Sequence, residues 1–223
     1  MKDLNNLTQK QKWFLDYLID QYKTSKKTIS IDQIGKDLKI SATSVRELIE
    51  LAKTIGLVKI EPRKGIQLLP YSFSPAVSKS LQAALRFNQD HFEQFFHLRN
   101  QIEKIYFKDA VQGISQERIS NLKEIVRKAN SMLNEITPRI PHVEHRNFHL
   151  IMYKELKNVF VFGLIESFWD MYELAGLNLY EDLEYLRNVW RYHERIVEEI
   201  EKKNFDNAYS TLVDHVELIH KRS

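Results

Sequence analysis

Apolar and polar positions follow two different patterns along the 223-residue chain. Residues 1–70 combine short helical patterns with a β-rich patch. Residues 76–223 instead keep the 3.6-residue period of amphipathic helices almost throughout. Between the two parts, Pro70 and Pro75 enclose a short segment with two serines, and such composition is typical of a domain boundary. We therefore expect two domains, joined by a linker at residues 71–75.

The first domain is expected to begin with three helices. Residues 8–22 carry apolar side chains at the i, i+1, i+4, i+5 spacing of an amphipathic helix. Ser30 and Gln33 have the form of a capping box, which would open a second, short helix. A tight turn follows, and Ser41 can then cap a third helix that ends at Gly56. The residues of this third helix expected to face inward are Val45, Leu48, Ile49 and Ala52.

A β-hairpin is predicted after the third helix. Residues 57–61 and 66–69 have the composition of strands, and Pro62-Arg63-Lys64-Gly65 between them is a turn sequence. Three helices followed by a small hairpin, with a short turn between the second and third helices, predict a winged helix-turn-helix. Such domains bind DNA in many proteins and serve as protein-interaction modules in others.

The second domain predicts an all-α bundle of six or seven antiparallel helices, so that the whole chain is mainly α. Gly113 is a plausible stop signal, and Ser115 and Asn204 are plausible starts. The expected helices span approximately residues 76–88, 90–112, 115–135, 141–157, 159–175, 179–203 and 205–221.

Composition narrows the classes of function. The chain has no cysteine, so disulfides are excluded and any metal must be held by His, Asp or Glu. Neither a transmembrane run nor the apolar core of a signal peptide is present, which favours a cytoplasmic protein without a membrane partner. Residues 1–72 carry a formal net charge of +5, whereas the remainder carries −2. A basic N-terminal part on a mildly acidic remainder fits contact with nucleic acid by the first domain.

A helix-turn-helix places its second helix in the major groove, with the first residues of that helix at the base edges and flanking cations on phosphates. The wing can contact phosphates or the minor groove. The candidate DNA contacts are therefore Ser41, Thr43, Ser44 and Arg46 on the helix and Arg63 and Lys64 in the wing.

The segment SATSVRELIELAKTIGLVKIEPRKG resembles the defining region of the GntR family of bacterial transcriptional regulators. Arg46-Glu47-Leu48, Gly56-Leu57-Val58 and Arg63-Lys64-Gly65 stand at matching positions. The resemblance implies that Arg46 and the wing, including Gly65, approach DNA. It also implies a homodimer that binds a palindromic double-stranded operator. Ala42 and Asp32 depart from the family, because basic residues often occupy these positions.

Three of the eight histidines lie within residues 142–149. His145 and His149 are four residues apart, so a helix would place them on one face, where they can share an ion. His193 and His215 lie 22 residues apart, on what should be successive antiparallel helices that a bundle can bring together. Spacing alone favours the alternative, an ordinary polar helix face, over a metal site. His142 could approach the same face, but it lies beside Pro141 at the start of the helix and is taken as a bystander.

Residues 75–221 resemble the effector domain of the FadR subfamily, known as the FadR C-terminal domain or FCD. The matching residues are the Leu98–Glu103 motif, His145 to His149, Asn158, His193 to Ile196, and His215. In metal-containing members an Asp and three His hold one divalent ion at the bottom of a cavity. The resemblance transfers this role to His149, His193 and His215.

Position 145 departs from the family, since His145 stands where the family has Asp. A neutral imidazole can also ligate, and a nitrogen-rich site favours Zn²⁺ or Ni²⁺ over hard ions. The alternative is a member that has lost its metal. The resemblance further implies a small carboxylate effector, with Arg99 and Asn158 as its contacts; a guanidinium pairs well with a carboxylate.

The expected function is therefore a DNA-binding transcriptional regulator controlled by a small organic acid, and not an enzyme. Whether the protein represses or activates transcription is left open. One alternative is a metal sensor, in which the ion itself is the signal. Another is a His-ligated metallohydrolase, which would require a general base beside the ion. Apart from Glu144 or Glu194, the sequence offers no positioned candidate for that base, and the helix-turn-helix would have no role.

Overall fold

The computed structural model describes residues 7–24, 28–174 and 182–220, apart from the side chains of residues 217–220. The predicted helix ends at residues 175, 179 and 221 lie outside these ranges. Two compact units are present, residues 1–80 and residues 81–223. Among the described residues, no helix is long and apolar enough to cross a membrane.

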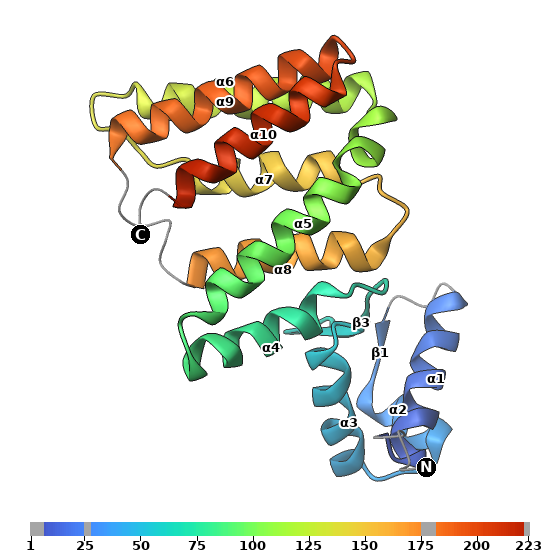
Figure 1. Ribbon diagram of the computed structural model, residues 1–223. Helices are drawn as coiled ribbons and strands as arrows, with labels where there is room; N and C mark the ends of the chain where they lie inside the picture. Colours follow the sequence, from blue (N-terminus) through green and yellow to red (C-terminus); the bar gives the residue numbers. More distant parts are fainter. Residues whose placement is uncertain (1–6, 25–27, 175–181, 221–223) are drawn as a thin grey trace, which may run out of the picture. The chain divides into compact units, whose positions relative to one another are not determined.

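Up to residue 73, the described part of the first unit contains three helices and a three-stranded antiparallel sheet (Figure 1). The order of the strands in the sheet is β1-β3-β2, so the predicted hairpin gains a short third strand on its β3 side. The elements are α1 (Gln9–Lys23), β1 (Thr28–Ile29), α2 (Ile31–Leu38), α3 (Ala42–Thr54), β2 (Val58–Glu61) and β3 (Gly65–Leu68).

Helices α2 and α3 of the first unit have the predicted N-caps, but the capping box lies at a different helix from the predicted one. Ser30 and Ser41 cap α2 and α3 as predicted, each accepting a hydrogen bond from a backbone amide three residues on. The Gln33 side chain does not close the predicted box, because it donates to Asp37 at 2.7 Å instead. The reciprocal capping box is found at the start of α1, between Thr8 and Gln11.

The core of the first unit forms around α3, whose four predicted inward residues are all buried. Gly56 follows α3 with a φ of 75°, a left-handed conformation that suits glycine and ends the helix. A Cβ at Gly56 would also lie 2.4 Å from the Pro75 ring. The apolar cluster includes Phe14, Leu18, Ile29, Ile34, Val45, Leu48, Ile49, Ala52, Val58, Ile66 and Leu68.

The described residues from 74 onward form seven helices, as the periodicity predicts. The helix α4 begins at Ser74, so the last two residues of the predicted linker are helical; Pro75 suits the first turn, where its missing N–H costs nothing. The helices are α4 (Ser74–Phe87), α5 (His91–Gln112), α6 (Gln116–Leu133), α7 (His142–Tyr153), α8 (Val159–Leu174), α9 (Leu183–Glu201) and α10 (Phe205–His220).

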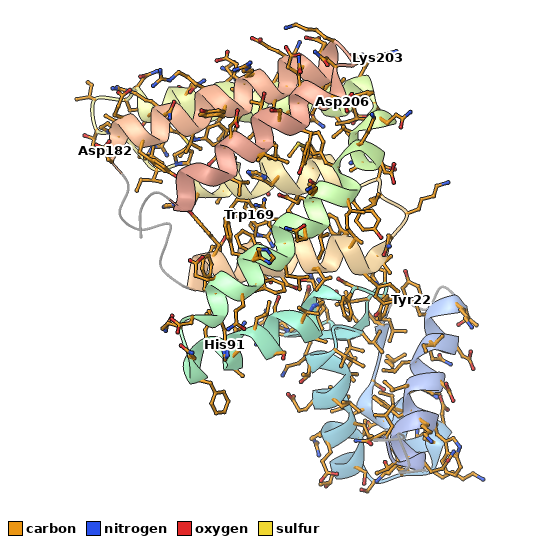
Figure 2. The ribbon with its side chains drawn as sticks, in the orientation of Figure 1. Tyr22, His91, Trp169, Asp182, Lys203 and Asp206 are labelled. Atoms are coloured by element: carbon orange, nitrogen blue, oxygen red, sulfur yellow. The ribbon has the colours of Figure 1, made fainter. Side chains whose placement is uncertain are left out.

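The helices of the second unit pack as an antiparallel bundle. Helices α9 and α10 lie side by side, α6 packs against α9 and α7, and α5 contacts α7, α8 and α10 (Figure 1). Trp169 lies in the interior, whereas Asp182, Lys203 and Asp206 lie at helix ends on the surface (Figure 2). The arrangement brings α5, α7, α9 and α10 around one buried point.

Candidate functional site

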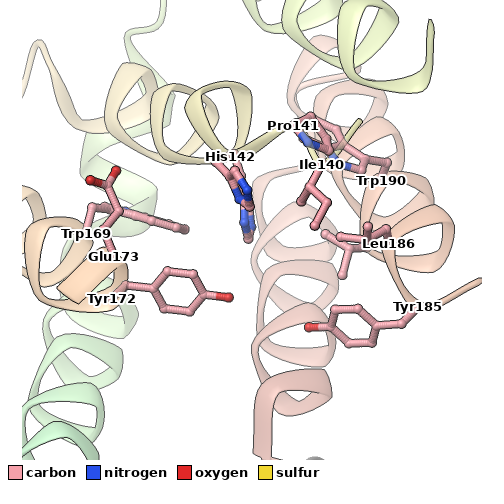
Figure 3. A pocket seen from close by; sticks show the side chains of 11 residues that line it. Ile140, Pro141, His142, Trp169, Tyr172, Glu173, Tyr185, Leu186 and Trp190 are labelled. Carbon is pink, nitrogen blue, oxygen red and sulfur yellow. The ribbon is translucent and has the colours of Figure 1, made fainter. Parts of the chain in front are cut away.

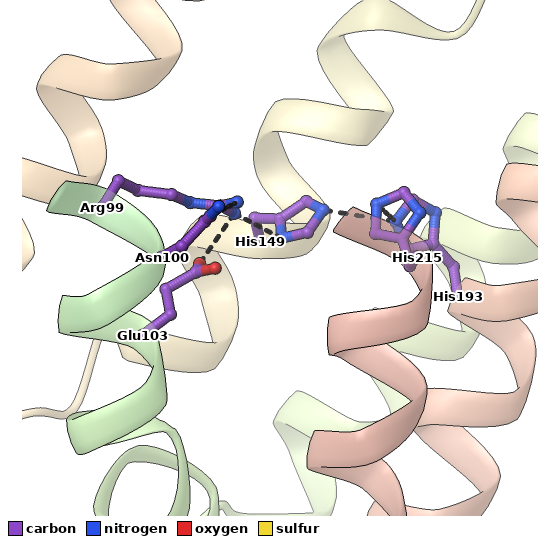
Figure 4. A network of polar contacts seen from close by, with 6 residues as sticks. All are labelled: Arg99, Asn100, Glu103, His149, His193 and His215. Atoms are coloured by element: carbon purple, nitrogen blue, oxygen red, sulfur yellow. Dashed lines mark hydrogen bonds and ion pairs between the residues drawn. The ribbon is translucent and has the colours of Figure 1, made fainter. Parts of the chain in front are cut away.

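Three helices bring their histidines together at the centre of the second unit. His149 comes from α7, His193 from α9 and His215 from α10, and each is at most 1% exposed. The Nε2 atom of His193 lies 3.2 Å from Nε2 of His149 and 3.2 Å from Nε2 of His215 (Figure 4). Residues up to 66 positions apart in the sequence thus converge with ring nitrogens facing one another.

His145 completes the cluster from one turn earlier in α7. Its ring centroid lies 4.9 Å from that of His193, 5.2 Å from that of His149 and 5.6 Å from that of His215. One ligand atom from each of the four histidines can be chosen so that all lie within 4.8 Å of one another. The four predicted ligands are therefore in one place. Their role as ligands stays a prediction.

The lowered pKa values of the clustered histidines favour the binding of a cation. Burial, with a contribution from neighbouring rings and from Arg99, holds the pKa of His149 well below its usual value. Burial likewise lowers the pKa of His193 and brings that of His215 to about 3. The three imidazoles are therefore neutral at pH 7, and a neutral imidazole offers one nitrogen lone pair to a metal.

A metal ion fits the contacts among the Nε2 atoms. His193 Nε2 faces two other nitrogens, but a neutral ring nitrogen either donates one hydrogen bond or accepts one. A central cation accepts all three lone pairs at once. Ligands of a tetrahedral zinc ion lie about 3.3 Å apart for Zn–N bonds of about 2.0–2.1 Å, close to the spacing found here. The residues therefore fit a nitrogen-ligated divalent ion.

Arg99 lies at the edge of this cluster. It is 2% exposed, and its Nη2 atom lies 2.8 Å from Glu103 Oε1 and 3.3 Å from His149 Nδ1 (Figure 4). A guanidinium only donates, so the contact with Nδ1 leaves the ring proton on Nε2 of His149. Ligation through Nε2 requires the opposite tautomer. An ion bound there would therefore displace Arg99 from His149 and make this donor available to another acceptor.

The partner of Arg99 was missed as a site residue. Glu103 is one helical turn further along α5 and 2% exposed, and it forms the buried ion pair with Arg99. Burial raises the pKa of Glu103, while the Arg99 charge opposes that rise. The i, i+4 spacing of an arginine and a glutamate was the available signal, but the same spacing is common on exposed helix faces.

A small cavity borders the cluster on the side of His145. Its volume is about 30 Å³, enough for one or two water molecules. His142 lines it, although sequence reasoning set this residue aside. The remaining walls, seen in part in Figure 3, are formed by Ile140, Pro141, Trp169, Tyr172, Glu173, Tyr185, Leu186, Val189 and Trp190.

Two other residues considered in the sequence lie apart from the cluster. Asn158 precedes α8, where its Oδ1 atom accepts hydrogen bonds from the backbone amides of Phe160 and Val161. This is a helix-capping role, and its predicted effector contact stays untested. Glu144 turns away to α6 and pairs with Lys128 at 2.7 Å, so it is not placed to replace the family's aspartate.

The candidate DNA-contacting residues lie together on the first unit. Ser41, Thr43 and Arg46 are exposed along α3, whereas Ser44 is half-buried and bonded to the Ser41 hydroxyl. A groove of about 830 Å³ lies beside Arg46, between the start of α2, the exposed face of α3 and the sheet. The groove also carries acidic side chains, namely Asp32, Glu47 and Glu50.

Two lysines of the wing form ion pairs with the same carboxylate. Glu61 lies 2.5 Å from Lys59 Nζ and 2.7 Å from Lys64 Nζ, and these contacts lower its pKa. Arg63 is exposed at the tip with a φ of 65°, in a turn closed by the Lys64 amide and the Glu61 carbonyl. Glycine is favoured at that turn position, so the arginine is held there against its backbone preference.

Comparisons with known proteins agree with both units. Residues 94–218, more than half of the chain, match the FCD domain family. Residues 6–65 match the family described as "Winged helix-turn-helix transcription repressor, HrcA DNA-binding".

Whole-chain relatives are regulators as well. The regulator LutR of Bacillus subtilis is 21% identical over 88% of this chain and 90% of its own length. The uncharacterized regulator YdhC of the same organism is 20% identical over 84% of this chain and 77% of its own length.

Solved structures give the same fold. The Streptococcus agalactiae GntR structure superposes with a TM-score of 0.71 at 15% identity, covering 96% of this chain and all of that one. Escherichia coli McbR/YncC gives a TM-score of 0.52 at 14% identity, covering 97% of this chain and 99% of that one. The two Bacillus subtilis relatives are described as transcriptional regulators, in agreement with the expected non-enzymatic function. The chain therefore belongs to the GntR family of transcriptional regulators, in the group that carries an FCD effector-binding domain.

Proposed function

We propose that this regulator changes its affinity for a palindromic operator when a small carboxylic acid binds beside the four-histidine cluster. The observation that carries the proposal is the convergence of three neutral, fully buried imidazoles with His145 at the edge of a cavity. A bundle core normally holds apolar side chains, and polar groups buried without a full set of partners cost free energy. A ligand-binding role accounts for their presence.

We propose His145, His149, His193 and His215 as the residues that hold a divalent ion, with Zn²⁺ or Ni²⁺ favoured by the all-nitrogen donor set. Such an ion supplies a Lewis acid that accepts a carboxylate oxygen. Arg99 would then turn its freed Nη2 donor from His149 toward the same carboxylate. Asn158 remains a proposed contact that would have to leave its capping position.

On the DNA side, we propose a homodimer in which each winged domain, residues 1–70, takes one operator half-site. The linker at residues 71–75 would join it to the effector domain at 76–223. The exposure of Arg46 and of the Arg63-Lys64-Gly65 tip supports their assignment to bases and phosphates. Thr43, at the exposed start of α3, is the proposed polar base contact, with Ser41 and Ser44 beside it.

The size of the cavity supports a coupling between effector and DNA. About 30 Å³ is far below the several hundred that small organic ligands occupy, so an effector must displace the walls. These walls come from α8, from α9, and from the start of α7 with the two residues before it, and α9 also carries His193. An effector that binds only the opened arrangement shifts the population toward it, and only such a difference in affinity can act on DNA binding.

A thermal-shift screen tests the proposal on the full chain loaded with Zn²⁺. Lactate, pyruvate, succinate, citrate and benzoate are the simple acids, used beside matched alcohols that lack the carboxylate. A rise in Tm with at least one acid, absent in His193→Ala, supports the proposed site. If DNA affinity follows the Zn²⁺ concentration while no acid changes either Tm or DNA binding, the protein is a metal sensor and the acid proposal is wrong.

A further inference from the structure

The cavity beside His145 has an unusual lining for the site of a simple acid. Among the described residues, its walls contain no lysine and no arginine, and its one formal charge is the Glu173 carboxylate. Arg99 does not line it and instead contacts His149. Apart from a bound ion, and the Arg99 donor that would turn toward the carboxylate at that ion, nothing in this cavity attracts an anion. A purely anionic effector would place its remaining surface against a negative charge.

Four aromatic side chains surround the same space. Trp169 lies with its ring centroid 4.8 Å from that of His145, and Trp190 lies 6.1 Å from it. The phenol groups of Tyr172 and Tyr185 extend toward one another from opposite sides, one from α8 and the other from α9 (Figure 3). Aromatic side chains gathered around a small space are one way in which proteins recognise organic cations.

Glu173 lies on the same wall as Trp169 and Tyr172, within α8. No ion pair joins it to a cation in the part of the chain that the structure describes. By contrast, Glu166 and Asp170, on the preceding turns of α8, both lie within 4.0 Å of Arg146. The basic group that interacts with Glu173 is the His142 imidazole of the same cavity, and burial lowers the pKa of that imidazole below its usual value. A carboxylate whose basic neighbour is kept neutral, beside four aromatic rings, is complementary to an ammonium group.

We infer that the effector carries a basic nitrogen as well as its acid group, so that it is a zwitterionic amino acid or a close relative. This inference rests on the proposed function, since the acid group is placed at the cluster. The ammonium group lies among Trp169, Tyr172 and Tyr185, with Glu173 as its counter-ion. The opposite orientation is unfavourable, because it sets the acid beside Glu173 and the ammonium beside the cluster that attracts anions.

Pairs of probes that differ only in the nitrogen give a direct test. The Zn²⁺-loaded full chain is titrated with 2-aminobutyrate against 2-hydroxybutyrate, and with 4-aminobutyrate against 4-hydroxybutyrate, by isothermal calorimetry. At least one amino acid should bind about ten-fold more tightly than its hydroxy acid, as expected for a partly desolvated cation against aromatic rings and a carboxylate. Glu173→Gln should reduce this ratio to about three-fold or less.

The matched control is Glu194→Gln, which removes one negative charge from the exposed face of α9 outside the cavity and should leave the ratio unchanged. Tyr185→Leu should also lower the ratio, and an unchanged Tm of each ligand-free variant excludes unfolding as the cause. If each hydroxy acid binds as tightly as its amino acid, the inference is overturned while the acid-binding proposal stands. If neither series binds and the simple acids also fail, both are overturned.

Discussion

The two candidate sites differ in where their ionisable side chains lie and in whether these side chains are charged. In the second unit, four imidazoles and one ion pair are enclosed in the bundle, and burial keeps the fully buried histidines neutral. In the first unit, Arg46, Arg63 and Lys64 are exposed and charged, with acidic side chains close by. The neutral imidazoles of the buried site can bind a cation, whereas the exposed surface of the first unit already carries charged side chains. The first should respond strongly to single substitutions and weakly to salt; the second should do the reverse.

The largest expected effect is on metal content. Replacing His193, the residue whose Nε2 contacts two other ring nitrogens, with alanine should lower bound Zn²⁺ from about one ion per chain to nearly none. A chelator should lower the Tm of the wild type but not of His193→Ala, because an ion that binds only the folded state stabilises it. Plasma mass spectrometry measures the content. His97→Ala, on an exposed face of α5, is the control, and equal loss in both would contradict the assignment.

The next effect compares a buried ion pair with an exposed one. Glu103→Ala leaves the Arg99 guanidinium buried without its carboxylate, and we expect unfolding in urea to become easier by about 3–5 kcal/mol. Glu124→Ala removes the partner of Arg127 on the exposed face of α6 and should leave the midpoint unchanged. Similar urea midpoints for the two variants would mean that burial does not increase the effect of the Arg99–Glu103 ion pair on the free energy of unfolding.

A smaller effect is expected at the exposed surface. Arg46→Ala removes the proposed base contact and should weaken binding to a DNA duplex selected from a random pool by about 1–3 kcal/mol. Arg127→Ala, an exposed arginine of the second unit, should leave the affinity unchanged. Fluorescence anisotropy at fixed salt gives both values. Should Arg46→Ala bind the selected duplex as tightly as the wild type, the assignment of α3 to the major groove is wrong.

The smallest effect has the opposite sign. Glu61 holds Lys59 and Lys64 in ion pairs that phosphates would have to replace, so Glu61→Gln should bind DNA about two- to five-fold more tightly at low salt. The gain should fade as salt rises, since exposed charges are screened. Glu117→Gln changes the net charge equally at an exposed position of α6 and provides the comparison. If Glu117→Gln raises the DNA affinity equally, the effect of Glu61→Gln comes from the change in net charge and not from the release of Lys59 and Lys64.

The sequence predicts the helices well and the surroundings of the site poorly. Periodicity and caps locate α3 and the bundle helices, because each depends on residues within a few positions of one another. The two-residue strand β1 was missed, since two residues cannot show a period of two. The cap prediction at Gln33 failed because Asp37, one turn ahead, offers its side chain a competing acceptor.

The histidines of the candidate site could likewise be predicted from the sequence, but the residues around them could not. The i, i+4 pair His145 and His149 is visible in the sequence, and the family resemblance adds His193 and His215. The aromatic wall was not predictable, because Trp169 and Tyr172 read as ordinary core positions of an apolar helix. Only the packing of α8 against its neighbours turns them toward a shared cavity, and that depends on contacts between distant parts of the chain.

The central claim is that the buried cluster controls the DNA-reading surface. Its most direct test is the affinity of the Zn²⁺-loaded full chain for the selected duplex, measured with and without a saturating acid identified in the thermal-shift screen or the paired titrations. We expect a change in affinity of about 5- to 150-fold, the usual range for coupling between two sites, and the loss of this change in His193→Ala while DNA binding itself persists. If the bound acid leaves the affinity unchanged, or if the change persists in His193→Ala, the buried cluster does not control DNA binding.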